Sequence, residues 1–204
     1  MNVHKQVLTT ASLLMLFAVL GAALVGETWE GTYETIKRNE QEVLLRKLNT
    51  ILPASSYDND LLADETELPK DSLLGTTKPS KAYRAYRNGK PVAIVLSPVA
   101  PDGYSGPIEL LVGINYDGTL AGVRVVKHRE TPGLGDAIEV ERSNWILGFA
   151  GKSLGNPPDK QWKVKRDGGI FDQFTGATIT PRAVVKAVRS ALVYFGEHRK
   201  QLFE

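Results

Sequence analysis

The sequence contains no cysteine, and this absence excludes several kinds of site at once. Without thiols the chain cannot form disulfides, ligate an iron–sulfur cluster through thiolates or use a cysteine nucleophile. Histidine is also scarce, because only His4, His128 and His198 occur, far apart and without the spacing of metal ligands. The sequence therefore predicts neither a metal site nor thiol chemistry.

A strong charge of one sign is lacking as well. The 204 residues carry 25 Lys and Arg against 23 Asp and Glu, a formal net charge of +2. The basic residues are scattered along the chain and do not gather on one predicted face, so a nucleic-acid partner is not expected. Hydrophobic residues make up 42% of the chain and charged residues 24%, which is ordinary for a globular protein.

One long apolar run stands near the N-terminus. Residues Val7–Val25 include no charged side chain over 19 positions, and as a helix they would span roughly 28 Å, about the hydrocarbon thickness of a bilayer. A cleaved signal peptide is the alternative, but the run is long and the sequence after it resembles a continuing helix. We therefore expect a single retained transmembrane helix.

Charges beside this run predict its orientation. Lys5 precedes the span, and Glu27 and Glu30 follow it. The positive-inside rule then places the N-terminus in the cytoplasm and the main domain outside, which in a Gram-negative cell is the periplasmic side of the inner membrane. The expected organisation is an anchor at 1–26, a helical and irregular connector at 27–80 and the main domain at 81–204.

The main domain is expected to be α+β, with mainly antiparallel strands. Helical periodicity over Thr28–Leu52 ends before Pro53, and residues 54–80 have the composition of an irregular loop. A short helix is expected at Val140–Ala150, and a final helix begins with Thr180 as its N-cap and Pro181 at its first position. Strand-like segments lie at Ala82–Arg87, Pro91–Ser97, Ile108–Tyr116, Leu120–His128 and Trp162–Lys165, the third and fourth joined by a turn at Asp117-Gly118.

The most specific stretch lies just before the final helix and reads DQFTGAT over residues 172–178. Gly176 and Ala177 leave little side-chain bulk, so a ligand can approach the backbone closely. The start of a helix offers unpaired N–H groups and a positive dipole end, which suit a phosphate. Hydroxyls of Thr175, Thr178 and Thr180 surround this point. Spacing alone is more typical of a capping turn without a ligand.

The same stretch resembles the flavinylation motif D-x-x-[ST]-G-A-[ST] of the FMN-binding domain family. This family includes the G subunit of the Rnf/Rsx electron-transport complex and the C subunit of the sodium-pumping NADH:quinone oxidoreductase. In the family, a flavin transferase uses FAD to esterify the last hydroxyl of the motif with the FMN phosphate. The resemblance implies a covalent FMN on Thr178, with Asp172 recognised by the transferase, and it assigns Thr178 no catalytic role.

Two further loops resemble the same family. They read APDGYSG at 100–106 and HRETPGLG at 128–135, and the resemblance implies that both approach the flavin. Without it, the second loop would be interpreted as a plain turn. We expect His128 to pair with a neighbouring carboxylate, and Trp145 and Trp162 to pack in the core. The cofactor-binding residues expected in all are Tyr104, Glu130, Thr131, Gly133, Leu134, Asp172, Thr175, Gly176, Ala177 and Thr178.

The resemblance covers essentially the whole chain and is nearer to Rnf/Rsx G subunits than to the quinone oxidoreductase subunit. It implies a non-catalytic electron carrier in a membrane complex that couples electron transfer of the ferredoxin/NAD type to ion translocation. The other membrane and peripheral subunits of that complex would be its partners. Three alternatives are the C subunit of the sodium-pumping enzyme, a membrane-tethered flavin sensor and an extracytoplasmic interaction domain without flavin.

Overall fold

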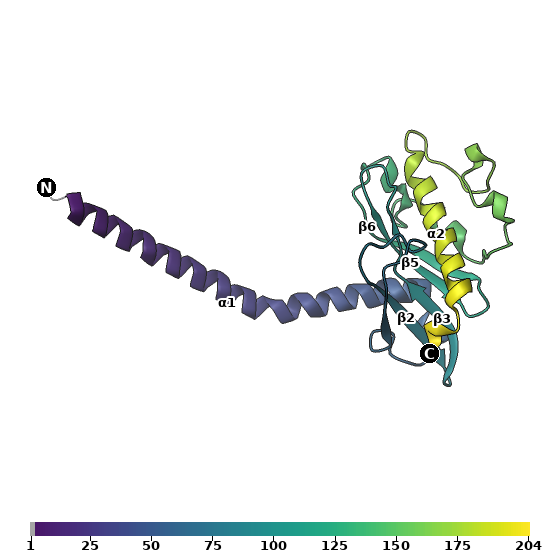
Figure 1. Cartoon of the computed structure of the whole chain (residues 1–204), viewed down its shortest axis with the longest axis horizontal. Coiled ribbons are helices and arrows are strands. Elements are labelled where there is room, and N and C mark those ends of the chain that lie inside the picture. Colours follow the sequence, from purple (N-terminus) through teal and green to yellow (C-terminus); the bar gives the residue numbers. More distant parts are fainter. Residues whose placement is uncertain (1–2) are drawn as a thin grey trace. The chain divides into compact units, whose positions relative to one another are not determined.

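The structure is a computed structural model that describes residues 3–204, so the first two residues of the predicted anchor at 1–26 lie outside the described residues. The chain divides into two compact units, Met1–Leu44 and Leu45–Glu204. Helix α1 (Val3–Ile51) forms the first unit, and its last turns belong to the second (Figure 1). The helix predicted at Thr28–Leu52 is therefore confirmed as a continuation of the apolar run.

The first unit has the properties of a membrane-crossing helix. Its most apolar 18-residue window has a mean hydropathy of 2.2 and no buried residue, so α1 is long and apolar enough to cross a membrane. The hydroxyls of Thr9 and Thr10 donate to the carbonyls of Lys5 and Gln6, each at 2.9 Å and one helical turn back. These bonds satisfy the hydroxyls within the helix itself, as an apolar surrounding requires.

The second unit is built on one antiparallel sheet, so the expected α+β class is confirmed. The order along the sheet is β1-β2-β3-β5-β4, and β6 pairs with β5. Strands β3 and β4 share one edge of β5, because β4 pairs with Ile108 and Glu109 while β3 pairs farther along. The strands are β1 (Glu65–Leu68), β2 (Ser80–Arg87), β3 (Lys90–Leu96), β4 (Val99–Ala100), β5 (Ile108–Asn115) and β6 (Leu120–Lys127).

The main core lies between this sheet and helix α2 (Ile179–His198). Alternate residues of β5 face the helix, as the two-residue period of a strand requires. Leu110, Val112 and Ile114 are all at most 1% exposed. The helix meets them with an apolar stripe at helical spacing. The buried stripe consists of Val184, Val185, Val188, Ala191, Leu192 and Phe195.

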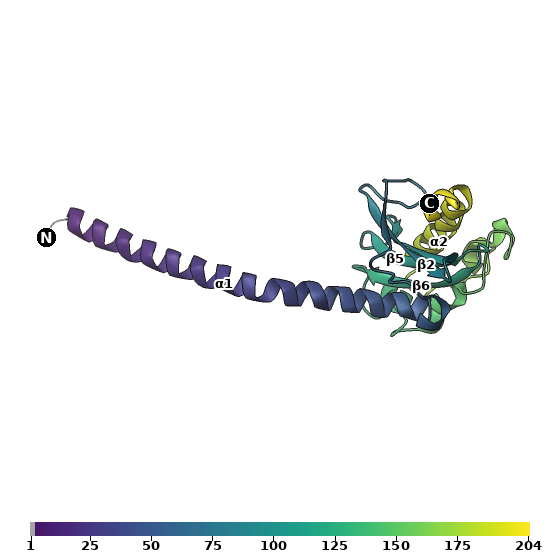
Figure 2. The ribbon, with the colours of Figure 1, turned by 90° about the horizontal axis from the view of Figure 1, so that it is seen from below.

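The end of α1 packs on the opposite face of the sheet, which Figure 2 shows across the sheet from α2. Buried Ile51 lies against Gly113 of β5 and Gly122 of β6, which face each other in the strand register. Lys47 Nζ donates to the carbonyls of Val125 and Val126 at 3.3 and 3.2 Å. The two glycines thus form a notch that receives the end of the helix.

Three local expectations were wrong. The loop expected at 54–80 contains β1, a short edge strand in which only Leu68 is buried, so the apolar pattern of a strand is weak there. Residues Trp162–Lys165 form no strand; Val164 makes only an isolated bridge to Phe171. The helix expected at Val140–Ala150 is a shorter 3₁₀ helix, Asn144–Phe149.

The notch yields a matched pair of substitutions. A Cβ atom on Gly113 would collide with Ile51 Cγ2, whereas a Cβ on Gly122 would meet the same atom at an ordinary 3.7 Å. Gly113→Ala should therefore lower the free energy of unfolding by about 1–3 kcal/mol through overpacking. Gly122→Ala should change it by less than about 0.5 kcal/mol.

Urea unfolding of the full chain in detergent, followed by tryptophan fluorescence, measures both variants. Combining Gly113→Ala with Ile51→Ala should cost less than the sum of the two single changes, because alanine lacks the colliding Cγ2. Equal stabilities for the two alanine variants would contradict the packing described.

Candidate functional site

Three loops meet at the start of α2 and enclose a cavity of about 360 Å³. They are the loop between β4 and β5, the loop after β6 and the turn that leads into α2. This volume lies at the lower end of the range of small-molecule sites. The lining residues are Tyr104, Glu130, Thr131, Leu134, Gly135, Gly176, Ala177, Thr178, Ile179 and Thr180.

The Glu130 carboxylate connects these three loops. Glu130 is only 4% exposed, and its Oε1 accepts a hydrogen bond from the backbone N–H of Ser105 at 3.0 Å. Its Oε2 accepts a short hydrogen bond from the hydroxyl of Thr180, which is fully buried in the first turn of α2. A buried carboxylate is costly to leave unpaired, so these donors hold the loops in place.

Two glycines let the backbone approach Glu130 closely. A Cβ atom at Gly135 would stand 2.9 Å from Glu130 Cβ and 3.0 Å from Thr180 Oγ1. A Cβ at Gly103 would stand 3.0 Å from Glu130 Oε1. Both distances are too short for ordinary packing, so a side chain at either position would push the loops apart.

His128 stabilises the loop that follows β6 and carries Glu130. The backbone N–H of Glu130 donates to His128 Nδ1 at 3.0 Å, which leaves Nε2 to donate to Glu139 Oε1, also at 3.0 Å. This pattern assigns the neutral tautomer with its proton on Nε2. The structure confirms the expected carboxylate partner, and His128 is not among the residues that line the cavity.

The turn before α2 differs from expectation at one point. Helix α2 begins at Ile179, so Thr178 occupies the N-cap position and Thr180 lies inside the first turn. The prediction of Thr180 as N-cap was wrong, because its hydroxyl is used by the buried Glu130. Gly176 has a φ of 80°, a left-handed conformation that glycine adopts at little cost, and it turns the chain into the helix.

The three hydroxyls of the turn have different surroundings. The hydroxyl of Thr180 is buried and bonded to Glu130. Thr175 is exposed and does not line the cavity. Thr178 is half-buried, lines the cavity and makes no side-chain capping bond to the helix. Among the three, Thr178 alone presents an uncommitted hydroxyl to the cavity, at the positive end of a 20-residue helix.

Aromatic packing holds the other end of the turn. Trp145 Nε1 donates to the carbonyl of Asp172 at 2.8 Å, and its ring meets that of Phe174 edge to face at 5.1 Å. Trp162 is 4% exposed and packs against Phe149 and Phe171. Both tryptophans therefore serve packing, as the sequence predicted, and neither lines the cavity.

Asp172 lies outside the cavity with its carboxylate in solvent. It forms an exposed ion pair with Lys165 at 2.6 Å. Nearby, the Arg182 guanidinium donates two hydrogen bonds to Asp167, and this pairing lowers the pKa of the Asp167 carboxyl below its usual value. Charged groups therefore flank the turn on its outer side.

The structure brings most of the predicted site residues together. Three of the ten, Gly133, Asp172 and Thr175, do not line the cavity. The remaining seven do, and so do Gly135, Ile179 and Thr180, which were not predicted as cofactor-binding residues. Ile179 and Thr180 were missed because the helix was expected to start later. Gly135 could have been predicted, because it ends the G-L-G string of the loop at 128–135 that was expected to approach the flavin.

Comparison with known proteins supplies two family matches. Residues 103–193 match the FMN-binding domain family, and residues 1–51 match the RnfG N-terminal region. The first match spans all the residues that line the cavity.

Similar proteins extend over nearly the whole chain. The G subunit of the ion-translocating oxidoreductase complex from Shewanella baltica is 51% identical over 94% of this chain and 90% of its own length. The protein of the same name from Pseudomonas aeruginosa is 50% identical over 98% and 93%. The crystal structure of NqrC from Shewanella oneidensis is 25% identical, with a TM-score of 0.49 over 73% of this chain and 72% of that one.

The contact between Thr180 and Glu130 can be tested by one substitution made at two positions. Thr180→Val preserves the shape but removes a donor from a buried carboxylate, which should lower the free energy of unfolding by about 1–3 kcal/mol. Thr175→Val alters an exposed hydroxyl and should change it by less than about 0.5 kcal/mol. Urea unfolding of the full chain in detergent measures both, and an equal loss at the two positions would refute the assignment.

Proposed function

The chain belongs to the family of G subunits of ion-translocating oxidoreductase complexes, and we propose that it relays electrons through an FMN esterified to Thr178. The observation that supports Thr178 is its free hydroxyl in a cavity at the start of a helix. The family match at residues 1–51 favours this subunit over the C subunit of a sodium-pumping NADH:quinone oxidoreductase.

The residues of the cavity suit the two ends of FMN. The backbone N–H groups and dipole at the start of α2 favour a phosphate at Thr178. Gly176 and Ala177 leave space for it, as does the absence of a capping bond from Thr178. At the mouth, apolar side chains of Tyr104, Leu134 and Ile179 are 68%, 43% and 44% exposed, a surface suited to a flat, largely apolar ring.

The flavin accepts and donates the electrons, whereas this chain positions it. Glu130 and Thr131 line the cavity and remain predicted contacts of the flavin. Both oxygens of the Glu130 carboxylate already accept hydrogen bonds from the chain itself. We therefore assign Glu130 chiefly to holding the loops at a fixed distance from Thr178.

Attachment requires a transfer with no change in oxidation state. Thr178 Oγ attacks the FMN phosphorus of FAD, a P–O bond of the pyrophosphate breaks, and AMP leaves. The hydroxyl proton passes to solvent or to a base of the flavin transferase, which supplies the FAD. Asp172 is exposed beside the turn, where a transferase can reach its carboxylate.

The apolar span of α1 and the family place the chain in the bacterial inner membrane. The main domain belongs on the periplasmic side, because Lys5 lies before the span and Glu27 follows it. A covalent tether suits such a location, since a released cofactor would be lost from the cell. The other subunits of the complex are its expected partners.

Loss of the Thr178 hydroxyl should abolish covalent flavin. The full chain, co-expressed with a flavin transferase and denatured on a gel, should give a fluorescent band under ultraviolet light. Thr178→Ala should give a dark band, whereas Thr175→Ala should retain at least part of the fluorescence. Fluorescence that survives in Thr178→Ala would show that the ester forms at another residue. A dark band from the unaltered chain would refute the covalent tether.

The orientation can be measured cleanly because the chain has no cysteine. Single substitutions Lys90→Cys in the main domain and His4→Cys before the span both lie at exposed positions and keep Lys5. A membrane-impermeant maleimide added to intact spheroplasts should label Lys90→Cys, and it should label His4→Cys only after lysis. The opposite pattern would place the domain in the cytoplasm.

A further inference from the structure

A second, larger cleft lies outside the cavity at Thr178. It has a volume of about 570 Å³ and runs between α2 and the segment 159–167. Figure 1 shows this green segment beside the helix. Buried Trp162, Val164 and Val185 contribute apolar surface to it. Its remaining walls are charged, with five basic and two acidic side chains.

Ion pairs line the helix side of this cleft. Arg182, Lys186 and Arg189 follow one another along α2 at helical spacing. Each pairs at 2.6 Å with an aspartate from a loop, respectively Asp167, Asp102 and Asp159. These ion pairs are exposed, so they contribute little to stability, but they neutralise part of the charge of the three cations.

Two lysines of the cleft form no ion pair. Lys160 and Lys163 are exposed and line the cleft opposite α2. Neither side chain forms an ion pair with another residue of the described part of the chain, 3–204. Besides the paired arginines, Lys163 lowers the pKa of the Asp159 and Asp167 carboxyls, so its charge is partly compensated. With five basic and two acidic side chains, the cleft still presents a net positive surface.

The charge is concentrated around the flavin turn. Residues 159–189 carry seven Lys and Arg against three Asp and no Glu, although the whole chain has a net charge of only +2. This segment includes the turn at 172–178, and the cleft residue Arg182 lies one helical turn after Thr178. A protein that acts on Thr178 would meet the cleft at the same time.

We propose that this cleft is the docking surface for the flavin transferase, which would approach it with a face rich in carboxylates. The inference rests on the proposed function. Subunits that stay assembled generally bury apolar faces, whereas a charged surface suits an encounter that forms fast and then separates. The transferase has to leave after it acts at Thr178, and the electron-transfer partners remain.

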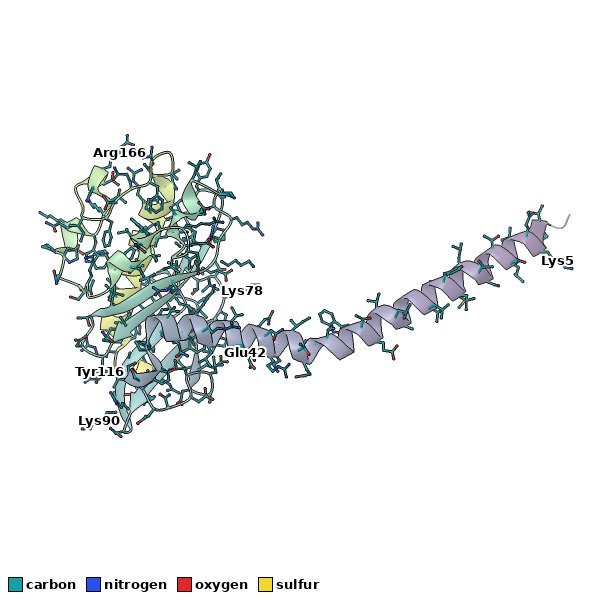
Figure 3. All side chains as sticks on the ribbon, turned by 180° about the vertical axis from the view of Figure 1, so that it is seen from behind. Lys5, Glu42, Lys78, Lys90, Tyr116 and Arg166 are labelled. Carbon is teal, nitrogen blue, oxygen red and sulfur yellow. The ribbon has the colours of Figure 1, made fainter. Side chains whose placement is uncertain are left out.

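Reversal of the two lysines without ion pairs tests the docking. Lys160→Glu/Lys163→Glu leaves the three ion-paired cations in place, and thermal unfolding shows whether the change at Lys163, which acts on Asp159 and Asp167, disturbs the fold. The matched control is Lys78→Glu/Lys90→Glu, the same change at exposed lysines outside the cleft. In Figure 3, Lys90 lies at the opposite end of the domain from Arg166, which adjoins the cleft residue Asp167.

The measurement is the initial rate at which gel fluorescence appears when the full chain in detergent is mixed with purified transferase and FAD. We expect the cleft variant to react at least about tenfold more slowly than the control variant at low salt. Added salt should slow the unaltered chain and should slow the cleft variant less. Thermal unfolding of both variants should match that of the unaltered chain.

Three other results would overturn the proposal. A cleft variant that reacts within twofold of the control would remove the docking role while leaving the tether at Thr178 intact. Normal flavin loading with impaired electron transfer in the assembled complex would assign the cleft to a redox partner. If the unaltered chain gains no flavin, the proposed function fails and the docking inference falls with it.

Discussion

The buried carboxylate of Glu130 is the constraint on which the site depends. It accepts hydrogen bonds from Ser105 in one loop and from Thr180 in the first turn of α2, while its own backbone belongs to a third loop. Because an unpaired carboxylate in this position would be costly, the three loops hold one arrangement together. Gly135 is required by the same contact, since a side chain there would meet Glu130 and Thr180, whereas a side chain at Gly103 would collide first with the Gly106 carbonyl oxygen and then with Glu130.

This constraint also separates the roles of the threonines. Thr180 is committed to Glu130, so its hydroxyl is unavailable for modification without disrupting the loops. Thr178 stands two residues earlier, at the N-cap position but without a capping bond. A hydroxyl that neither caps the helix nor ties a loop adds little to stability, and this leaves it free to accept a phosphate. The structural and the proposed chemical roles are thus divided between neighbouring residues of the same type.

The sequence predicts the regular parts of the fold better than the irregular ones. The strand predicted at Ile108–Tyr116 follows strong periodicity, and the structure confirms it within one residue, while the final helix starts two residues earlier than predicted. Strand β1 was missed because its stability comes from pairing with β2, which no local pattern records. The Glu130–Thr180 contact joins residues 50 positions apart, so no spacing rule could reveal it, and Thr180 was taken for a cap instead.

The clustering of basic side chains is likewise a product of the fold that the sequence does not reveal. Along the sequence the basic residues look scattered, yet the fold brings cations of α2 and of the segment 159–167 to the two sides of one cleft. Three aspartates pair with the helix cations, whereas Lys160 and Lys163 form no ion pair. Lys163 also acts on Asp159 and Asp167, but these two carboxylates face five basic side chains in the cleft. If the cleft served only stability, more acidic residues would be expected in it, since like charges held together oppose folding. The remaining net positive charge is better explained by carboxylates that arrive with a partner and leave with it.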